Sequence, residues 1–445
     1  MIRKIRRKFA WIGLAITATW AAPMLSYGAE EQFIPVTSFR TGPVGGVGTV
    51  LYGGYIDYIE LLNKRDGGIN GVKLIWEECD TEYKVERGVE CYERLKKKGI
   101  TGASFFNFNN GGITYAVTDR ATADKIPVIS LGSGRVDSAD GRVFPYFFQL
   151  LHTLWGGNTS QIKFIAGQEG GMDKLKGKKF VNLYLGNTGG KETIVSLDAQ
   201  AKRYGFEITH IEATPPGNEL QAQWLRIRQI KPDWVFLQGW GVMAPTALKT
   251  AQKVGFPIDR VIGPWPTGSN EAVIPAGDAA RGFISITFSP AGTHYPVIQD
   301  ITKHLYGGGK KGNLSDPSTI GSGIYNSGVL QAMLGTEGIR VAQEKYGKKV
   351  LSGEQIRWGL EHLNMDEKRI KQLGAWGLLQ PMKTSCLDHQ GGGAVKIIQW
   401  DGKKWNELTD WVAADRALER SLVETEAAKY AKEKGVTPRD CSKES

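Results

Sequence analysis

The chain has 445 residues, more than one hydrophobic core usually organises, so its length predicts two domains. Hydrophobic residues make up 41% and charged residues 23% of the chain, which is typical of a globular protein and excludes a disordered or fibrous one. The net charge is +10, but the lysines are spread along the chain rather than gathered in one stripe, and we expect no nucleic-acid partner.

The first 28 residues are typical of a signal peptide. Five basic residues within 3–8 precede an apolar run over 10–22, which is too short for an ordinary membrane span, and small residues follow. We therefore expect export with cleavage near Gly28 or Ala29, which lowers the net charge from +10 to +5 because five basic residues and no acidic ones are removed. A pair of arginines in the basic stretch leaves both the secretory and the twin-arginine export routes open.

Strands and helices then alternate in a rhythm typical of a parallel, doubly wound α/β sheet. Apolar periodicity predicts strands at 33–39, 72–76, 102–108 and 126–131, with helices near 51–62, 85–95 and 113–121. A turn rich in Gly and Asn, residues 66–71, ends the first of these helices, because Gly adopts positive φ without penalty and Asn tolerates it.

The rhythm restarts near residue 178 and predicts a second, similar domain. The expected strands lie at 178–187, 206–213, 232–238 and 260–265, and the expected helices at 193–204, 220–230 and 244–254. Further along, the sequence predicts helices at 328–345 and 353–363, a hairpin at 394–405, and a terminal helix at 413–434 with its charges in water.

Loops rich in small, amide and aromatic residues follow the predicted strands. In a parallel sheet such loops meet at one edge and form the usual ligand site. They lie at 40–48, 77–84, 107–112 and 131–135 in the first series, and at 185–190, 237–241 and 263–270 in the second. These residue types suit hydrogen bonding to, and stacking on, a small organic molecule.

Five stretches in a characteristic order give the chain its resemblance to a known family. They are "TGPVGGVG" at 41–48, "GGINGVKL" at 67–74, Asp80, "IPVIS" at 126–130 and "GDAARGF" at 277–283. In this combination the chain resembles the branched-chain amino-acid type of periplasmic solute-binding protein. The resemblance implies a type I periplasmic binding fold, with two doubly wound lobes joined by a three-segment hinge, and a monomer that closes on a ligand and delivers it to the permease and ATPase subunits of an ABC importer.

The resemblance also implies domain boundaries. We expect the first lobe to take residues 29–150 and 287–376, and the second lobe to take 151–286 and 377–445, including a C-terminal helical tail. A periplasmic sensor built on the same fold is an open alternative to a transport receptor.

The resemblance places the ligand site on loops of both lobes. Where amino-acid binders of the family hold the ligand carboxylate with serines, this chain has an Asn-Asn-Gly sequence, and where they pair the ligand ammonium with an acid, it has Trp265. The predicted ligand-binding residues are Asn109, Asn110, Gly111, Ser133, Gly134, Arg135, His152, Trp155, Trp240 and Trp265. For His152 and Trp155, which lie at the first lobe crossing, hinge packing is an equal alternative.

These replacements predict the class of ligand. An ammonium without a partner in a closed cleft is costly, so we expect a small aromatic or aliphatic molecule, carboxylates included. A branched-chain amino acid or an amide is the alternative ligand.

No enzymatic activity, cofactor or metal site is expected, because the chain lacks nucleophile-elbow, zinc-protease and phosphate-loop motifs. The four cysteines of an exported chain favour disulfides, and we expect Cys79 to pair with Cys91 and Cys386 with Cys441. Four free thiols are the competing state.

Overall fold

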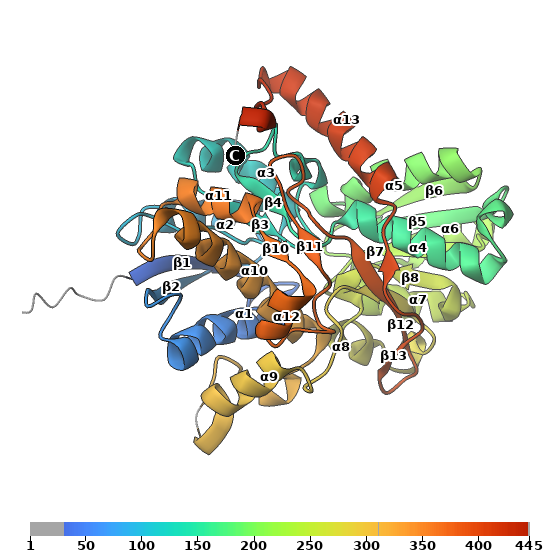
Figure 1. Ribbon diagram of the computed structural model, residues 1–445. Helices are drawn as coiled ribbons and strands as arrows, with labels where there is room; N and C mark the ends of the chain where they lie inside the picture. The colour runs from blue at the N-terminus through green and yellow to red at the C-terminus, as the bar shows by residue number, and fades with distance from the viewer. Residues whose placement is uncertain (1–30, 310, 444–445) are drawn as a thin grey trace, which may run out of the picture.

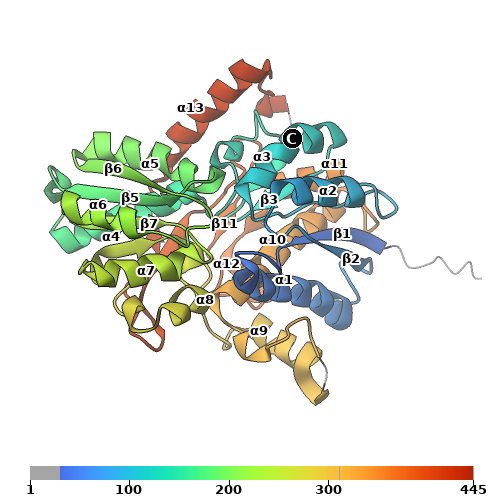
Figure 2. The ribbon, with the colours of Figure 1, turned by 180° about the vertical axis from the view of Figure 1, so that it is seen from behind.

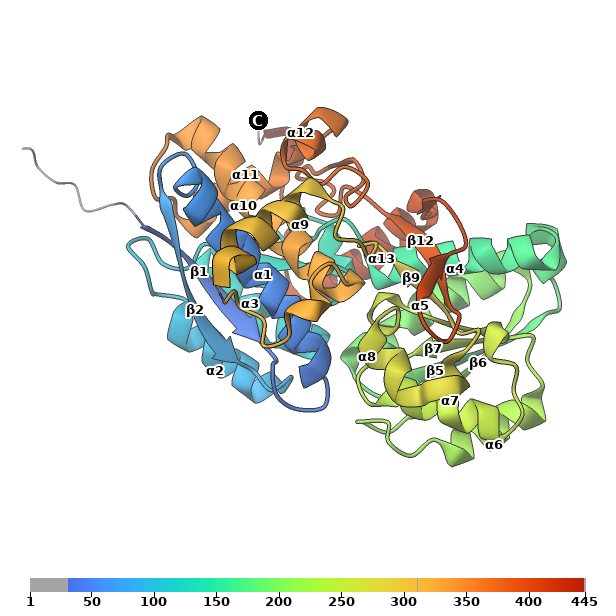
Figure 3. The same cartoon turned by 90° about the horizontal axis from the view of Figure 1, so that it is seen from below.

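The computed structural model describes residues 31–309 and 311–443, so the predicted signal peptide lies outside the described residues. Two α/β bodies lie side by side, as seen in Figure 1 and from below in Figure 3. The predicted α/β class with doubly wound parallel sheets is confirmed.

The first body contains short parallel strand pairs covered by helices. β1 (Glu31–Ser38) pairs with β2 (Lys73–Asp80), and β3 (Val128–Ser130) pairs with β4 (Phe147–Gln149). The helices of this body are α1 (Gly45–Asp66), α2 (Val85–Leu95), α3 (Gly111–Asp124), α10 (Gly323–Tyr346) and α11 (Gly353–Glu361). The long helices α1 and α10 pack against each other, so residues from far apart in the chain share one core.

The predicted strand at 102–108 is not formed as a regular strand. This segment makes an isolated bridge between Phe106 and Val128, and the Ser104 N–H donates to the carbonyl oxygen of Phe33 at 3.0 Å. It therefore lies extended between β1 and β3 with few backbone hydrogen bonds to either strand. Apolar periodicity does not indicate how many such hydrogen bonds a segment makes.

The turn after α1 forms as predicted. Gly67 and Gly68 have φ of 71° and 95°, and their N–H groups donate to carbonyl oxygens in the last turn of α1. A side chain at Gly68 would place its Cβ 2.0 Å from the carbonyl oxygen of Val72. The Asn63 amide then bonds both backbone groups of Leu74, at 2.7 and 2.8 Å, so α1 is fixed directly to the start of β2.

The second body is built on an eight-stranded sheet. Its strand order is β13-β12-β9-β8-β7-β5-β6, with β14 paired to β12. The parallel strands are β5 (Lys179–Leu185), β6 (Glu207–Ala213), β7 (Trp234–Gln238), β8 (Val261–Gly263) and β9 (Ile284–Thr287). The antiparallel strands are β12 (Ala394–Trp400), β13 (Trp405–Glu407) and β14 (Val412–Ala413), and β12 with β13 forms the predicted hairpin.

Helices cover this sheet and link it to the first body. The covering helices are α4 (Leu154–Glu169), α5 (Thr188–Tyr204), α6 (Gln221–Ile230) and α7 (Met243–Lys253). Shorter elements are α8 (Asn270–Val273), α9 (Pro296–Ile301), α12 (Glu367–Gln372), β10 (Asn364–Met365) and β11 (Met382–Lys383). No helix within 31–309 and 311–443 has the length and apolar character of a membrane span.

The terminal helix α13 (Arg416–Lys434) crosses from one body to the other. It contacts α4 and α5 of the second body and the turn η1 (Val136–Ala139) of the first, and Figure 2 shows it above the junction, between α5 and α3. The expectation that its charges all lie in water is wrong. Glu419 is fully buried and accepts hydrogen bonds from Thr153 and, at 2.9 Å, from Arg416.

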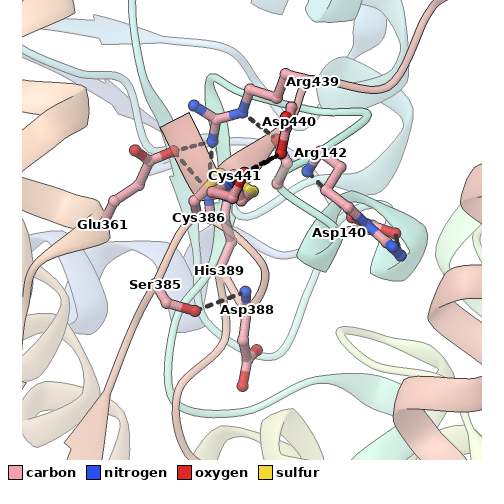
Figure 4. The surroundings of a disulfide bond; sticks show 12 residues. Asp140, Arg142, Glu361, Ser385, Cys386, Asp388, His389, Arg439, Asp440 and Cys441 are labelled. Carbon is pink, nitrogen blue, oxygen red and sulfur yellow. Dashed lines mark hydrogen bonds and ion pairs between the residues drawn. A yellow bond between two sulfur atoms is a disulfide. The ribbon is translucent and has the colours of Figure 1, made fainter. Parts of the chain in front are cut away.

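Both predicted disulfides are present in the structure. Their Cα atoms are 5.8 Å apart in Cys79–Cys91 and 5.7 Å apart in Cys386–Cys441, which is ordinary disulfide geometry. Figure 4 shows that the second disulfide lies beside the buried Glu361 and His389, whose side chains are 3.0 Å apart, and beside Arg439, which also pairs with Glu361. This disulfide therefore links the segment that follows α13 in the chain to the segment that follows β11.

Candidate ligand-binding site

A small cavity lies between the two bodies, at the carboxyl ends of their strands. The space open to the centre of a water-sized sphere is about 40 Å³, and one water molecule needs about 10–15 Å³ of such space. The first body contributes Phe39, Val44, Val47, Tyr83, Asn109, Gly111, Gly132, Ser133 and Gly134. The second body contributes Leu154, Gly189, Trp240, Gly241, Trp265 and Pro266.

Trp265 joins the two bodies at this cavity. Its indole N–H donates to the carbonyl oxygen of Gly132 at 2.8 Å, its ring lies 5.1 Å from that of Phe288, and only 6% of the residue is exposed. Gly132 has φ of 69°, and a Cβ there would lie 2.5 Å from the indole nitrogen. The glycine is thus required for this contact, and the structure is closed around the cavity.

Trp240 and Tyr83 supply further aromatic surface. The Trp240 ring would lie 3.0 Å from a Cβ at Gly189, so the missing side chain makes room for the indole. The Tyr83 ring packs edge-on to Phe39 with centroids 5.1 Å apart. Aromatic rings from both bodies therefore face one small volume.

The polar side chains of the cavity are neutral. The Asn109 amide donates to the Gln331 side chain at 2.7 Å, which leaves its carbonyl oxygen for Ser133, whose hydroxyl lies 3.5 Å away. No Asp, Glu, Lys, Arg or His is among the described residues that line this cavity.

Two helices begin at the cavity. α3 starts at Gly111 with Asn110 as its N-cap, and α5 starts at Thr188 with Asn187 as its N-cap. A Cβ at Gly111 would lie 3.6 Å from the backbone nitrogen of Gly189, so the two first turns approach each other. Helix N-termini carry partial positive charge, which favours a negatively charged group nearby.

Six of the ten predicted ligand-binding residues line this cavity: Asn109, Gly111, Ser133, Gly134, Trp240 and Trp265. The structure places the other four elsewhere. Asn110 caps α3 by accepting from the Ile113 N–H at 3.2 Å, and its amide donates to the Tyr83 carbonyl oxygen at 3.1 Å.

Arg135, His152 and Trp155 are buried away from the lining. Arg135 is paired with Asp137 at 2.9 Å, and the Trp155 indole donates to the backbone carbonyl oxygen of Glu192 at 2.8 Å. His152 packs with its ring 5.2 Å from Phe288, and burial lowers its pKa to about 3, so it is neutral at ordinary pH. Its position beneath Gly132 and Trp265 is that of a packing residue at the crossing between the bodies.

The lining also includes residues that were not predicted. Phe39, Val44, Val47 and Tyr83 lie on two of the strand-end loops that the sequence indicates, 40–48 and 77–84, or at their edge. Choosing among the residues of those loops depends on the direction of each side chain, and a loop sequence does not report that direction.

The fold and this cleft between two α/β bodies define a class of binding protein. The chain matches the periplasmic binding protein family over residues 31–404 and belongs to that family. No curated protein gives a match.

Solved structures resemble the chain over most of its length. A protein of the Pseudomonas fluorescens group, described as an ABC transporter permease, is 46% identical, with 93% of this chain and 100% of that one covered and a TM-score of 0.87. A branched-chain amino acid ABC transporter protein from Thermus thermophilus with bound valine is 20% identical, with 89% and 99% covered and a TM-score of 0.74. A solute-binding protein from R. palustris in complex with benzoate is 18% identical, with 87% and 97% covered and a TM-score of 0.66.

The family assigns the molecule its general role. It is a solute-binding protein of an ABC transporter, it binds a small molecule, and it is not an enzyme. The type I periplasmic binding fold implied by the sequence is confirmed. The two distant structures support the fold alone, and what they bind is a property of those proteins.

Proposed function

We propose that the cavity captures a small organic carboxylate with an aromatic or aliphatic body, and that the protein delivers it to the permease and ATPase subunits of an ABC importer. The observation that carries this proposal is the composition of the lining, which combines aromatic rings from both bodies with neutral polar groups and, among the residues that the structure describes, no charged side chain. Such a lining can bury an apolar body and hold one polar end.

The lining disfavours an α-amino acid. A buried ammonium without a carboxylate partner costs several kcal/mol, and where the family resemblance implies that carboxylate this chain has Trp265, whose N–H already donates to the carbonyl oxygen of Gly132. A branched-chain amino acid would therefore find no carboxylate partner for its ammonium group in this lining.

The lining favours a carboxylate over a neutral amide. The first turns of α3 and α5 approach each other at Gly111 and Gly189, and each helix N-terminus stabilises a nearby anion by about 0.3–1 kcal/mol. Ser133 adds a hydroxyl donor. The small volume of this closed state favours a compact molecule over a long chain.

The proposed transport cycle rests on two rigid lobes. We propose that they comprise residues 29–150 with 287–376, and 151–286 with 377–445, in a monomer exported to the periplasm after removal of a signal peptide. In support, α10 packs on α1 of the first body and α11 packs on α10, whereas β12 extends the sheet of the second. The exception is α13, which contacts both.

A ligand panel tests the proposal. Benzoate, isovalerate, benzamide and valine share size but differ in charge and hydrogen-bonding groups, and each is added to the mature protein in a thermal-unfolding assay and then titrated calorimetrically. A ligand at 100 times its Kd adds about 2.7 kcal/mol to the free energy of unfolding. We expect stabilisation by benzoate or isovalerate, which carry a carboxylate without an ammonium group, and none by valine, which carries both. Valine bound at micromolar strength, with no carboxylate bound, would overturn the proposed ligand class.

A further inference from the structure

The side chain of Asn109 is held in one orientation at the cavity between the two bodies. Asn109 lines that cavity, is only 5% exposed, and has a φ of 47°. Positive φ is uncommon for a residue other than glycine, and it persists where the surrounding structure enforces it. The contacts that hold Asn109 therefore decide which of its atoms the cavity offers to a ligand.

The amide nitrogen of Asn109 has its partners in the core of the first body. It donates to Gln331 Oε1 at 2.7 Å and to the Tyr52 hydroxyl at 3.4 Å. Neither partner lines the cavity, because Gln331 is completely buried on α10 and Tyr52 is 1% exposed on α1. A side-chain amide has two N–H groups, so these contacts leave Asn109 none to donate to a ligand.

Gln331 fixes this orientation of the Asn109 amide. Its Oε1 also accepts from the Asn107 amide at 2.7 Å, and its Nε2 donates to the Ser327 hydroxyl at 3.2 Å. A carbonyl oxygen has two lone pairs, and the two asparagine amides use both. Turning the Asn109 amide over would bring its own carbonyl oxygen against Gln331 Oε1, and two acceptors repel. Gln331 is thus a positioning residue for Asn109.

The cavity is therefore offered a hydrogen-bond acceptor, Asn109 Oδ1. Within the part of the chain that the structure describes, its donor is the Ser133 hydroxyl at 3.5 Å, which is long for an O–H···O hydrogen bond. In the proposed function this hydroxyl serves the ligand carboxylate, and Asn109 Oδ1 is then left without a donor. A buried acceptor without a donor is unfavourable, so a ligand that brings its own donor binds better.

We propose that the preferred ligand is an α-hydroxycarboxylate, whose hydroxyl donates to Asn109 Oδ1 while its carboxylate lies at the first turns of α3 and α5. A hydroxyl on the carbon next to the carboxylate suits this site, because Asn109 directly precedes Asn110, the N-cap of α3. The inference rests on the proposed function and narrows its ligand class. It also makes Gln331 a specificity-determining residue, although Gln331 does not line the cavity.

The experiment compares three acids of matched shape by calorimetric titration of the mature protein. Isovalerate, α-hydroxyisovalerate and valine carry a hydrogen, a hydroxyl and an ammonium group on the same carbon, and the enantiomers of the hydroxy acid are measured separately. We expect the better enantiomer to bind about fivefold or more tightly than isovalerate, because it satisfies a buried acceptor. Valine should bind more weakly than both, because its ammonium finds no carboxylate partner.

Variants of Gln331 test the positioning role through the ratio of the two affinities. Gln331→Met removes the acceptor and frees the Asn109 amide to turn, so the preference for the hydroxy acid over isovalerate should fall to within about twofold. Gln331→Glu keeps acceptor oxygens and should keep the preference. Gln343→Met is the matched control, since Gln343 is a buried residue of the same helix that accepts from Asn70 at 2.9 Å away from the cavity. It should leave the ratio unchanged.

The comparison of ligands on the wild type needs no variant, and circular dichroism shows whether each variant is folded. Equal affinities for isovalerate and both enantiomers of α-hydroxyisovalerate would overturn the inference and leave the proposed function standing. Tighter binding of valine than of the hydroxy acid, or an unchanged preference in folded Gln331→Met, would overturn it as well. Failure of the proposed function has a different signature, the absence of binding by every carboxylate tested, and the inference would fall with it.

Discussion

Replacing Trp265 by Ala removes an indole that joins the two bodies across the cavity. The change deletes the 2.8 Å hydrogen bond to Gly132 and the ring that lines the cavity beside it. Phe288, whose ring is 5.1 Å away, loses one of its aromatic neighbours and keeps His152. Both the closed arrangement and the surface offered to a ligand body are therefore affected.

The size of the effect follows from these contacts. A buried hydrogen bond contributes about 0.5–1.5 kcal/mol and an aromatic contact about 0.5–1.5 kcal/mol beyond area burial. Together they amount to about 1–3 kcal/mol, or roughly a fivefold to hundredfold loss of affinity. Trp265→Phe keeps a ring but lacks the N–H, so we expect it to recover part of this loss.

The assay is calorimetric titration with the carboxylate that stabilises the wild-type protein best, with benzoate as the first probe. Because a buried Trp→Ala change costs about 3–5 kcal/mol of stability, each variant is first checked by thermal unfolding and measured well below its Tm. Trp376→Ala is the matched control, since Trp376 is 44% exposed and does not line the cavity. The reasoning would be refuted by wild-type affinity in Trp265→Ala, above all if valine were the tighter ligand.

Three other outcomes are expected. Reduction should add four hydrogen atoms to the intact mass, two for each disulfide, and an unchanged mass would mean four free thiols. Burial opposes ionisation of Glu361, but His389 and Arg439 outweigh it and lower its pKa to about 2, so stability that is present above the unfolded pKa is lost as pH falls. In chemical unfolding, the free energy of unfolding of the wild type should fall by up to about 3 kcal/mol more than that of Glu361→Gln between neutral pH and pH ~2. The same pH dependence of the unfolding free energy in both proteins would contradict this. Gly132→Ala should lower Tm and weaken ligand binding, because φ is 69° there and a Cβ would meet the Trp265 indole, and wild-type values for both would show that this contact is not required.

The sequence predicts those features that depend on local chemistry. The turn at 66–71 needs residues that tolerate positive φ, and the structure shows Gly67, Gly68, Asn70 and Gly71 with positive φ. The loops that carry Trp240 and Trp265 could be predicted because each follows a strand in a parallel sheet, where carboxyl ends converge, whereas the family resemblance singled out the two residues, which both line the cavity.

Two residues, Arg135 and Glu419, owe their positions to partners far along the chain. Arg135 looks like a cation for the ligand, but it is surrounded by Asp137 and by Tyr430, almost 300 residues later, on a helix whose crossing position no local pattern reports. Glu419 is a second example. A charged residue in a charged helix is predicted to be exposed, but the fold buries Glu419 against Thr153.

The crossing helix α13 has a mechanical consequence for opening of the cleft. Nineteen helical residues at about 1.5 Å each form a strut of about 28 Å that bends and stretches little. One end is held to the second body by the hydrogen bond that Thr153 donates to Glu419, and the other is fastened by the Cys386–Cys441 disulfide and by Arg439 bonded to the Gly141 carbonyl oxygen of the first body. Because α13 contacts both bodies, it resists their separation on its own side. An opening of the cleft would therefore be widest at the rims remote from α13.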